Sequence, residues 1–125
     1  MKDYPALPEA HAPNVLHPLC PSRQVLGMLT SRWGALILVA LAGRTMRFSQ
    51  LRRELGDVSE RMLAQTLQGL EAQGMVRRVA HAVVPPHVDY SLTEIGEEAA
   101  VLVRGLADWV ERRLPEILAR RGDVC

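Results

Sequence analysis

The 125-residue chain has few aromatic residues and almost no lysine. One Phe, two Trp and two Tyr make up 4% of the residues, so a core must be built mainly from aliphatic side chains. Lys2 is the single lysine, and arginine supplies the remaining basic residues, which favours bidentate recognition of planar or anionic groups. With 48% apolar and 23% charged residues, the chain is expected to fold as one globular domain.

The sequence also lacks long apolar runs and closely spaced cysteines. The longest apolar stretch, residues 30–43, is about half the roughly 20 residues that a membrane helix needs. The first fourteen residues contain no apolar segment typical of a signal peptide. Cys20 and Cys125 do not form a disulfide framework. We therefore expect a protein of the reducing cytosol (cytoplasmic) with no membrane partner.

Motifs of common enzymes are missing as well. The sequence has no GxGxxG, no P-loop and no HExxH motif. The four histidines, His11, His17, His81 and His87, lack metal-ligand spacing along the chain. The sequence therefore predicts no catalytic residues, no cofactor and no metal, and an enzyme is not expected.

Charge is distributed unevenly along the chain. Residues 44–78 contain seven arginines against four acidic residues, a net charge of +3. Residues 79–125 contain five arginines against eight acidic residues, a net charge of −3. A basic middle and an acidic end indicate two faces with different partners.

The N-terminal part of the chain is divided by proline. Five of the eight prolines lie in the first 21 residues, so residues 1–19 are expected to form an arm, either a disordered tail or a segment that wraps a partner. Helices are predicted over residues 21–30 and, with Ser31 as N-cap, over residues 32–42. The second helix is apolar on all sides and should be buried.

The middle of the chain predicts two helices joined by a tight turn. A short extended piece at residues 46–48 is followed by helices over 50–55, capped by Ser49, and 60–73, capped by Ser59. The last of these has an apolar face opposite a polar one. The apolar face comprises Met62, Leu63, Thr66, Leu67 and Leu70, and the polar face Arg61, Gln65 and Gln68.

The remaining sequence predicts a hairpin and a long helix. Alternating segments 75–84 and 88–92 flank a tip at Pro85, Pro86 and His87. Thr93 then caps a helix from residue 94 to about residue 113, with Pro115 near its end or opening a further turn. The expected fold is mainly α with a small antiparallel sheet, a winged helix-turn-helix dimerised through terminal helices. Its domain spans residues 20–114, followed by a tail at 115–125.

Six short stretches, taken in order, resemble the HxlR-type winged helix-turn-helix regulators, which are related to the MarR-like group. They are residues 20–21 (CP), 32–33 (RW), 47–52 (RFSQLR), 59–63 (SERML), 70–76 (LEAQGMV) and 84–96 (VPPHVDYSLTEIG). The resemblance implies a cytosolic homodimeric transcription regulator that binds pseudo-palindromic double-stranded DNA. This chain departs from the family pattern at His81, where Tyr is usual, and at His87, where Arg or Lys is common.

The predicted DNA-binding residues lie on the two central helices and around the hairpin. Arg can read guanine and Gln can read adenine, whereas a helix N-terminus favours a phosphate. The alternative for each is a solvated surface position. The candidates are Arg47, Ser49, Gln50, Arg52, Arg53, Ser59, Arg61, Gln65, Gln68, Arg78 and His87.

Two further sites are predicted outside the helix-turn-helix. The long helix carries two apolar stripes, so Leu102, Leu106, Trp109 and Val110 are expected at a dimer interface rather than in one core. Cys20 stands at a helix N-terminus near Arg23, where a thiolate is favoured. The predicted function is a repressor that responds to oxidants or electrophiles through Cys20. The alternatives are a regulator that senses a small non-covalent ligand, or a protein-interaction module that does not bind DNA.

Overall fold

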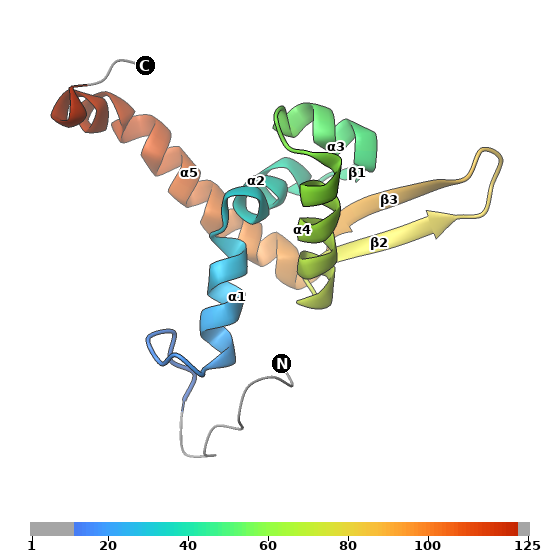
Figure 1. Ribbon diagram of the computed structural model, residues 1–125, viewed down its shortest axis with the longest axis horizontal. Coiled ribbons are helices and arrows are strands. Elements are labelled where there is room, and N and C mark those ends of the chain that lie inside the picture. Colours follow the sequence, from blue (N-terminus) through green and yellow to red (C-terminus); the bar gives the residue numbers. More distant parts are fainter. Residues whose placement is uncertain (1–11, 123–125) are drawn as a thin grey trace.

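Five helices and a three-stranded antiparallel sheet form the part of the chain, residues 12–122, that this computed structural model describes. This architecture confirms the predicted fold class. In chain order the elements are α1 (Pro21–Leu29), α2 (Arg32–Leu41), β1 (Thr45–Arg47), α3 (Phe48–Leu55), α4 (Glu60–Ala72), β2 (Val76–His81), β3 (His87–Leu92) and α5 (Glu94–Arg121) (Figure 1).

Helix α2 is the centre of the core, as its apolar sequence predicts. The Ser31 hydroxyl oxygen accepts a hydrogen bond from the Gly34 N–H at 3.1 Å and so caps the helix. Ile37, Leu38 and Leu41 are completely buried, and α2 contacts every other helix and strand β3. Burial of these aliphatic side chains is the main stabilising contribution of the fold.

The sheet has the strand order β1-β3-β2, with both pairs antiparallel. Strand β1 lies one residue earlier than expected, because Phe48 begins α3 instead of ending the strand. Strand β2 ends at His81, three residues before the predicted end, and residues 82–86 form the tip of the hairpin. His87 is the first residue of β3 and pairs with His81, so its predicted place at the tip is wrong.

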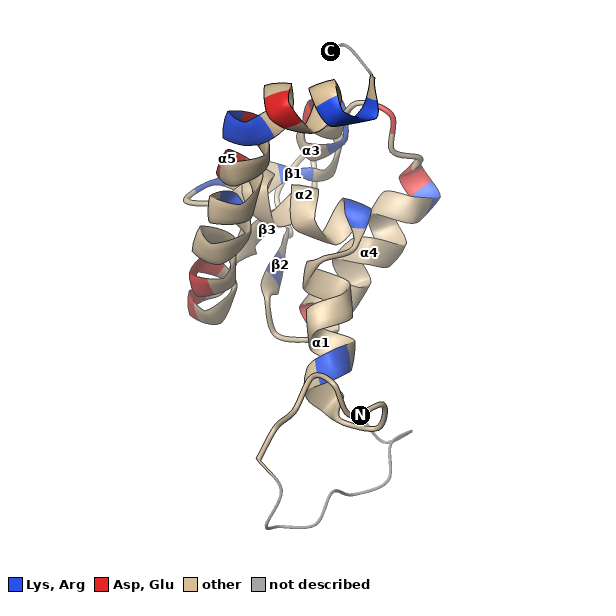
Figure 2. Ribbon diagram, turned by 90° about the vertical axis from the view of Figure 1, so that its left-hand side faces the viewer, with Lys and Arg blue, Asp and Glu red and all other residues tan. Residues whose placement is uncertain are grey.

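Helix α5 is longer than predicted. It continues through Pro115 to Arg121, so residues 115–121, expected to be a tail, are helical. Proline removes one backbone donor and crowds the preceding turn. This end of the helix projects away from the body and can bend, and Figure 2 shows the last turns of α5 running in a different direction from the rest.

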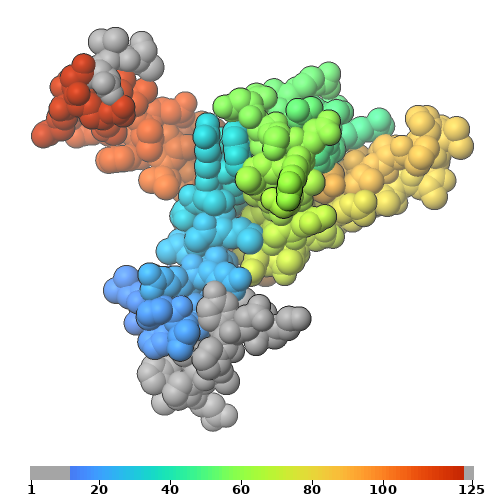
Figure 3. Space-filling view, viewed as in Figure 1, coloured from blue at the N-terminus to red at the C-terminus, as the bar shows by residue number. Residues whose placement is uncertain are grey.

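Three parts of the chain project from the central body: the N-terminal loop with α1, the outer half of α5, and the β2–β3 hairpin (Figure 3). Of the predicted N-terminal arm, residues 12–19 form turns before α1, and residues 1–11 lie outside the described residues. Within residues 12–122, no single helix has the length and apolarity of a membrane span; α1 and α2 reach them only when combined across a 68° bend.

Candidate nucleic-acid interface

Helix α4 has one buried face and one exposed polar face. Its N-cap is Ser59, whose hydroxyl oxygen accepts a hydrogen bond from the Met62 N–H at 3.0 Å. The buried face comprises Leu63, Leu67 and Leu70, and the side chains of Arg61, Gln65 and Gln68 are exposed on the opposite face. The polar face of α4 is therefore free to contact a partner along three successive turns.

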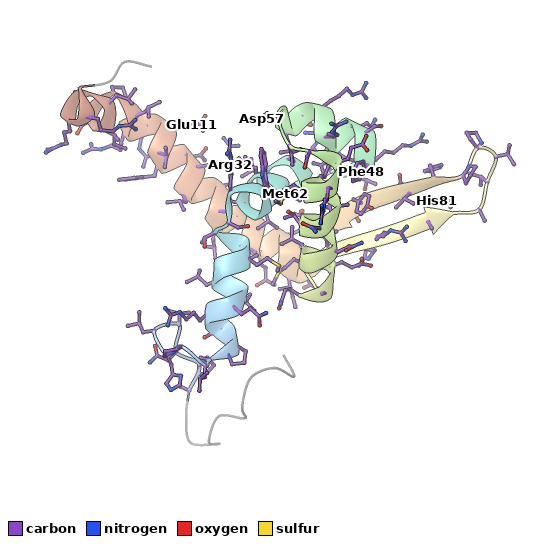
Figure 4. The ribbon with its side chains drawn as sticks, in the orientation of Figure 1. Arg32, Phe48, Asp57, Met62, His81 and Glu111 are labelled. Atoms are coloured by element: carbon purple, nitrogen blue, oxygen red, sulfur yellow. The ribbon has the colours of Figure 1, made fainter. Side chains whose placement is uncertain are left out.

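Met62 does not belong to the buried face of α4. Its side chain is 42% exposed, so its predicted place with the apolar residues is wrong (Figure 4). Residue 62 lies about 100° around the helix from Leu63, at the edge of the buried stripe. The apolar face of α4 is thus narrower than the sequence pattern indicates.

Helix α3 and the turn to α4 use two of the predicted contact residues for internal hydrogen bonds. The Gln50 side-chain oxygen accepts from the Arg47 N–H at 2.9 Å. Arg52 donates to the Val58 carbonyl oxygen at 3.3 Å and forms an ion pair with Glu60 at 3.2 Å. Gln50 therefore caps the start of α3, and Arg52 fixes the geometry between α3 and the start of α4.

The start of α3 also corrects a predicted cap. The N-cap residue is Arg47, and Ser49 lies inside the first turn instead of preceding it. Ser49 and Arg53 are exposed and line a shallow hollow of about 300 Å³ between α3 and the start of α4. Within residues 12–122, the Arg53 side chain makes no ion pair, so its charge is available to an anion.

The hairpin carries exposed apolar residues at its tip and arginines nearer its base. Val84 is 99% exposed and Val83 is 54% exposed. Arg78 is exposed on β2, opposite Tyr90 of β3. The tip itself has no charged side chain, and His87, which was predicted there, is directed toward Asp89 with only 23% of its side chain exposed.

One apolar stripe of α5 is left exposed by the rest of the chain that the structure describes. Ile95, Leu102, Leu106, Trp109 and Val110 are 60%, 76%, 57%, 48% and 39% exposed. An apolar groove of about 440 Å³ runs between α5 and α2, lined by Leu36 and Val39 on one side and by Val103 and Leu106 on the other. In Figure 2, acidic residues lie both on the first turns of α5 and toward its C-terminal end.

The thiol of Cys20 is buried beneath the N-terminal loop. Its side chain is 2% exposed, and Sγ lies 2.9 Å from the Ser22 hydroxyl and 3.3 Å from the Asn14 N–H. Hydrogen bonds from Ser22, and then from Asn14, lower the pKa of the Cys20 thiol from its ordinary value of 9.0 and outweigh the opposing effect of burial. Arg23, the neighbour expected to favour the thiolate, is not among the causes of the lowered pKa of Cys20. Cys125 lies outside the described residues.

Two helices joined by a tight turn, followed by a β-hairpin, define a winged helix-turn-helix protein. The second helix of that motif, α4, presents a polar face that has no partner within residues 12–122. In this class of fold the second helix enters the major groove of DNA and the first crosses the backbone.

Residues 28–117 match the model of the HxlR-like helix-turn-helix family, and the chain belongs to this family. It is 58% identical over 110 residues to an uncharacterized HTH-type transcriptional regulator, YtfH of Escherichia coli (strain K12), covering 88% of this chain and 87% of that protein. The structure is similar to the transcriptional regulator ytfH from Salmonella typhimurium, with 57% identity, a TM-score of 0.83, and coverage of 89% of this chain and 99% of the other.

A second solved structure is similar at lower identity. The oxidized form of the redox regulator HypR matches with a TM-score of 0.69 and 33% identity, covering 74% of this chain and 96% of that one. The chain is therefore a transcriptional regulator with a helix-turn-helix, in a family that implies DNA binding and whose named relatives are regulators rather than enzymes.

Proposed function

We propose that the protein is a homodimeric repressor that reads a pseudo-palindromic operator with α4. The observation that carries this proposal is the exposed polar face of Arg61, Gln65 and Gln68, opposite three buried leucines. Arginine bonds guanine O6 and N7 through two donors, and glutamine bonds adenine N6 and N7. These three side chains are assigned to base recognition, with Ser59 at the start of the helix beside the DNA backbone.

The phosphate contacts are assigned to residues around α4. Arg53 and Ser49 line the hollow beside α3, and Arg47 and Arg78 lie at the two outer strands of the sheet. Gln50 contributes by capping the start of α3, and Arg52 contributes by holding α3 against the start of α4. His87 is left out of the phosphate contacts because it faces Asp89.

Arg61→Ala and Arg53→Ala distinguish base reading from phosphate contact. We expect Arg61→Ala to lose about 1–3 kcal/mol of discrimination between the promoter upstream of the protein's own gene and a scrambled duplex. Arg53→Ala should weaken binding to both duplexes equally and reduce the salt dependence. Arg112→Ala, on the outer part of α5, serves as the control. Equal loss on both duplexes for Arg61→Ala would remove Arg61 from base recognition.

The exposed stripe of α5 supports dimerisation. Two recognition helices are needed to read two half-sites one turn of DNA apart. Leu106→Glu should convert a dimer to a monomer in sedimentation velocity, because it places a carboxylate in the apolar stripe. Val101→Glu is the matched control, since Val101 is 71% exposed on another side of the same helix. A wild-type chain that sediments as a monomer at micromolar concentration would contradict the dimer.

The buried thiol supports an oxidant-responsive switch. In the proposed step the Cys20 thiolate attacks a peroxide oxygen, forms a sulfenic acid and releases hydroxide. An oxygen added to Sγ would compete with its contacts to the Ser22 hydroxyl and the Asn14 N–H, so we expect oxidation to displace the start of α1. HypR, a relative at 33% identity, is named a redox regulator.

DNA binding before and after hydrogen peroxide tests the switch. Wild type should release the operator and regain it with a thiol reductant, whereas Cys20→Ser should not release it. Ser22→Ala should raise the pH at which Cys20 is half alkylated by iodoacetamide, because it removes the main cause of the lowered pKa. Release that persists in Cys20→Ser would favour the small-ligand regulator. The cytosolic location stays a prediction.

A further inference from the structure

Two histidines and an aspartate lie together on one face of the hairpin, outside the residues assigned to DNA. His81 of β2 pairs directly with His87 of β3, and Asp89 follows two residues later on the same face. The His81 Nε2 atom lies 2.8 Å from Asp89 Oδ2, and the His87 Nε2 atom lies 3.8 Å from the same oxygen. The two rings are stacked with centroids 4.6 Å apart. His81 lies well out along β2 (Figure 4).

The hydrogen bonding of this cluster is incomplete. Asp89 and His81 satisfy one another, but the His87 nitrogen faces the carboxylate oxygen at 3.8 Å, beyond hydrogen-bond distance. Arg47, opposite Asp89 on β1, forms no ion pair with it among residues 12–122. A cation between the His87 nitrogen and the Asp89 carboxylate would give both groups a partner.

The donor atoms match the ligand set and spacing of a transition metal. All three lie within 4.8 Å of one another. Zn²⁺ binds nitrogen and oxygen at 2.0–2.2 Å, so tetrahedral ligand atoms lie about 3.4 Å apart. The two distances to Asp89 bracket that value, so shifts of about 1 Å would close the site. Two imidazoles suit Zn²⁺ and exclude a preference for Mg²⁺ or Ca²⁺, which bind oxygen.

We propose that His81, His87 and Asp89 form a three-ligand site for Zn²⁺ on the hairpin, with a fourth position open to solvent. The side chains are 38%, 23% and 28% exposed, so an ion can enter while the strand pairing holds the ligands. The spacing of the histidines along the sequence did not indicate a metal site, because the ligands come from two strands and are brought together by their register.

A metal ion at this site would give the β2–β3 hairpin a positive charge that its tip lacks. Residues 83–86 are two valines and two prolines, so the tip offers no cation to a phosphate. A bound Zn²⁺ adds two positive charges next to one carboxylate, and a phosphate oxygen of DNA can take the open position. This consequence rests on the proposed function, whereas the metal site itself does not.

Metal binding is tested first, without DNA. The full-length protein, without a histidine tag, is titrated with Zn²⁺ by calorimetry and with Co²⁺ by its d–d absorption. One ion per chain is expected, and His81→Ala, His87→Ala or Asp89→Asn should each weaken binding at least about tenfold. His17→Ala and Cys20→Ser are controls that should bind as wild type does, and circular dichroism confirms that each variant is folded. Binding that survives His87→Ala, is lost in Cys20→Ser, or is absent in wild type would overturn the site.

DNA binding is then compared in Zn²⁺ and in a chelator. Wild type should bind the promoter duplex more tightly with Zn²⁺, and Asp89→Asn should show no difference between the two conditions. Metal binding without any DNA binding would refute the proposed operator recognition and leave the site standing. DNA binding in a chain that takes up no metal would refute the site alone. Equal DNA affinity of metal-loaded and chelated wild type would show that no phosphate occupies the open position.

Discussion

Helices α2 and α5 are both rich in aliphatic residues, but the single chain buries them to very different extents. Helix α2 has ten residues and buries Gly34, Ile37, Leu38, Ala40 and Leu41. Helix α5 has 28 residues and buries only Gly96 and Ala100. Apolar content therefore shows that a helix needs a partner, whereas the fold shows whether that partner lies in the same chain.

The largest difference in stability between the two helices is expected for leucine-to-alanine substitutions. Leu38→Ala is expected to lower the free energy of unfolding by about 2–5 kcal/mol, because it opens a cavity in the fully buried centre of α2. Leu102→Ala, at a position that is 76% exposed, should change it by less than about 0.5 kcal/mol at low protein concentration. Urea unfolding measures both. Equal losses would mean that α5 is buried within the monomer.

The second largest change in stability is expected at the buried start of α5. A Cβ at residue 96 would collide with the Met75 carbonyl oxygen and approach Leu92. Gly96→Ala should therefore lower the free energy of unfolding by about 1–3 kcal/mol, the usual cost of overpacking. Thermal unfolding of wild type and variant measures the loss. Unchanged stability would show that α5 is not fixed against the turn before β2.

Gly105 offers the matched comparison on the same helix. No atom lies within 4 Å of a Cβ built there, so Gly105→Ala should raise the free energy of unfolding by about 0.5–1 kcal/mol through helix propensity alone. The same thermal unfolding measures the gain. A loss that grows with protein concentration would instead place a partner subunit against this side of α5.

The smallest effect concerns the exposed ion pairs of α5. Arg104 forms ion pairs with Asp108 at 2.8 Å and Glu111 at 3.2 Å, and its side chain is 48% exposed. Arg104→Ala should lower the free energy of unfolding by about 0.5 kcal/mol or less, and the difference should shrink in high salt. A larger, salt-insensitive loss would indicate that the arginine is buried in an assembly.

The elements that sequence reasoning located well are those with local signals. Ser31, Ser59 and Thr93 each accept a hydrogen bond from the backbone N–H three residues on, as capping hydroxyls do. The cap of α3 was missed because Arg47 has no hydroxyl and Ser49 stands nearby as a misleading signal. Helix α5 was shortened because Pro115 is a strong stop signal that an exposed, bending helix tolerates.

Sequence reasoning missed the features that depend on strand register. It also missed those that depend on which hydrogen-bond acceptor a side chain takes. Whether Arg52 faces outward or donates to Val58 is decided by the conformation of a turn, not by helix periodicity. His81, His87 and Asp89 meet because the hairpin places residues 81 and 87 opposite each other. Ending the predicted strand three residues earlier would have revealed that pair.

The attachment of α5 has a mechanical consequence. The Thr93 hydroxyl donates to the Gly74 carbonyl oxygen at 2.6 Å, the Thr93 N–H donates to the Met75 carbonyl oxygen at 3.0 Å, and the Glu97 carboxylate accepts from the Gly43 N–H. These hydrogen bonds attach the start of α5 to the turn that follows α4, so that α5 can tilt about this point. From residue 94 to 114 the helix is roughly 30 Å long, so a 5° rotation moves its far end by about 3 Å. In the dimer proposed above, with the outer halves of two α5 helices in contact, such a tilt would move each α4 helix relative to its partner by a comparable amount.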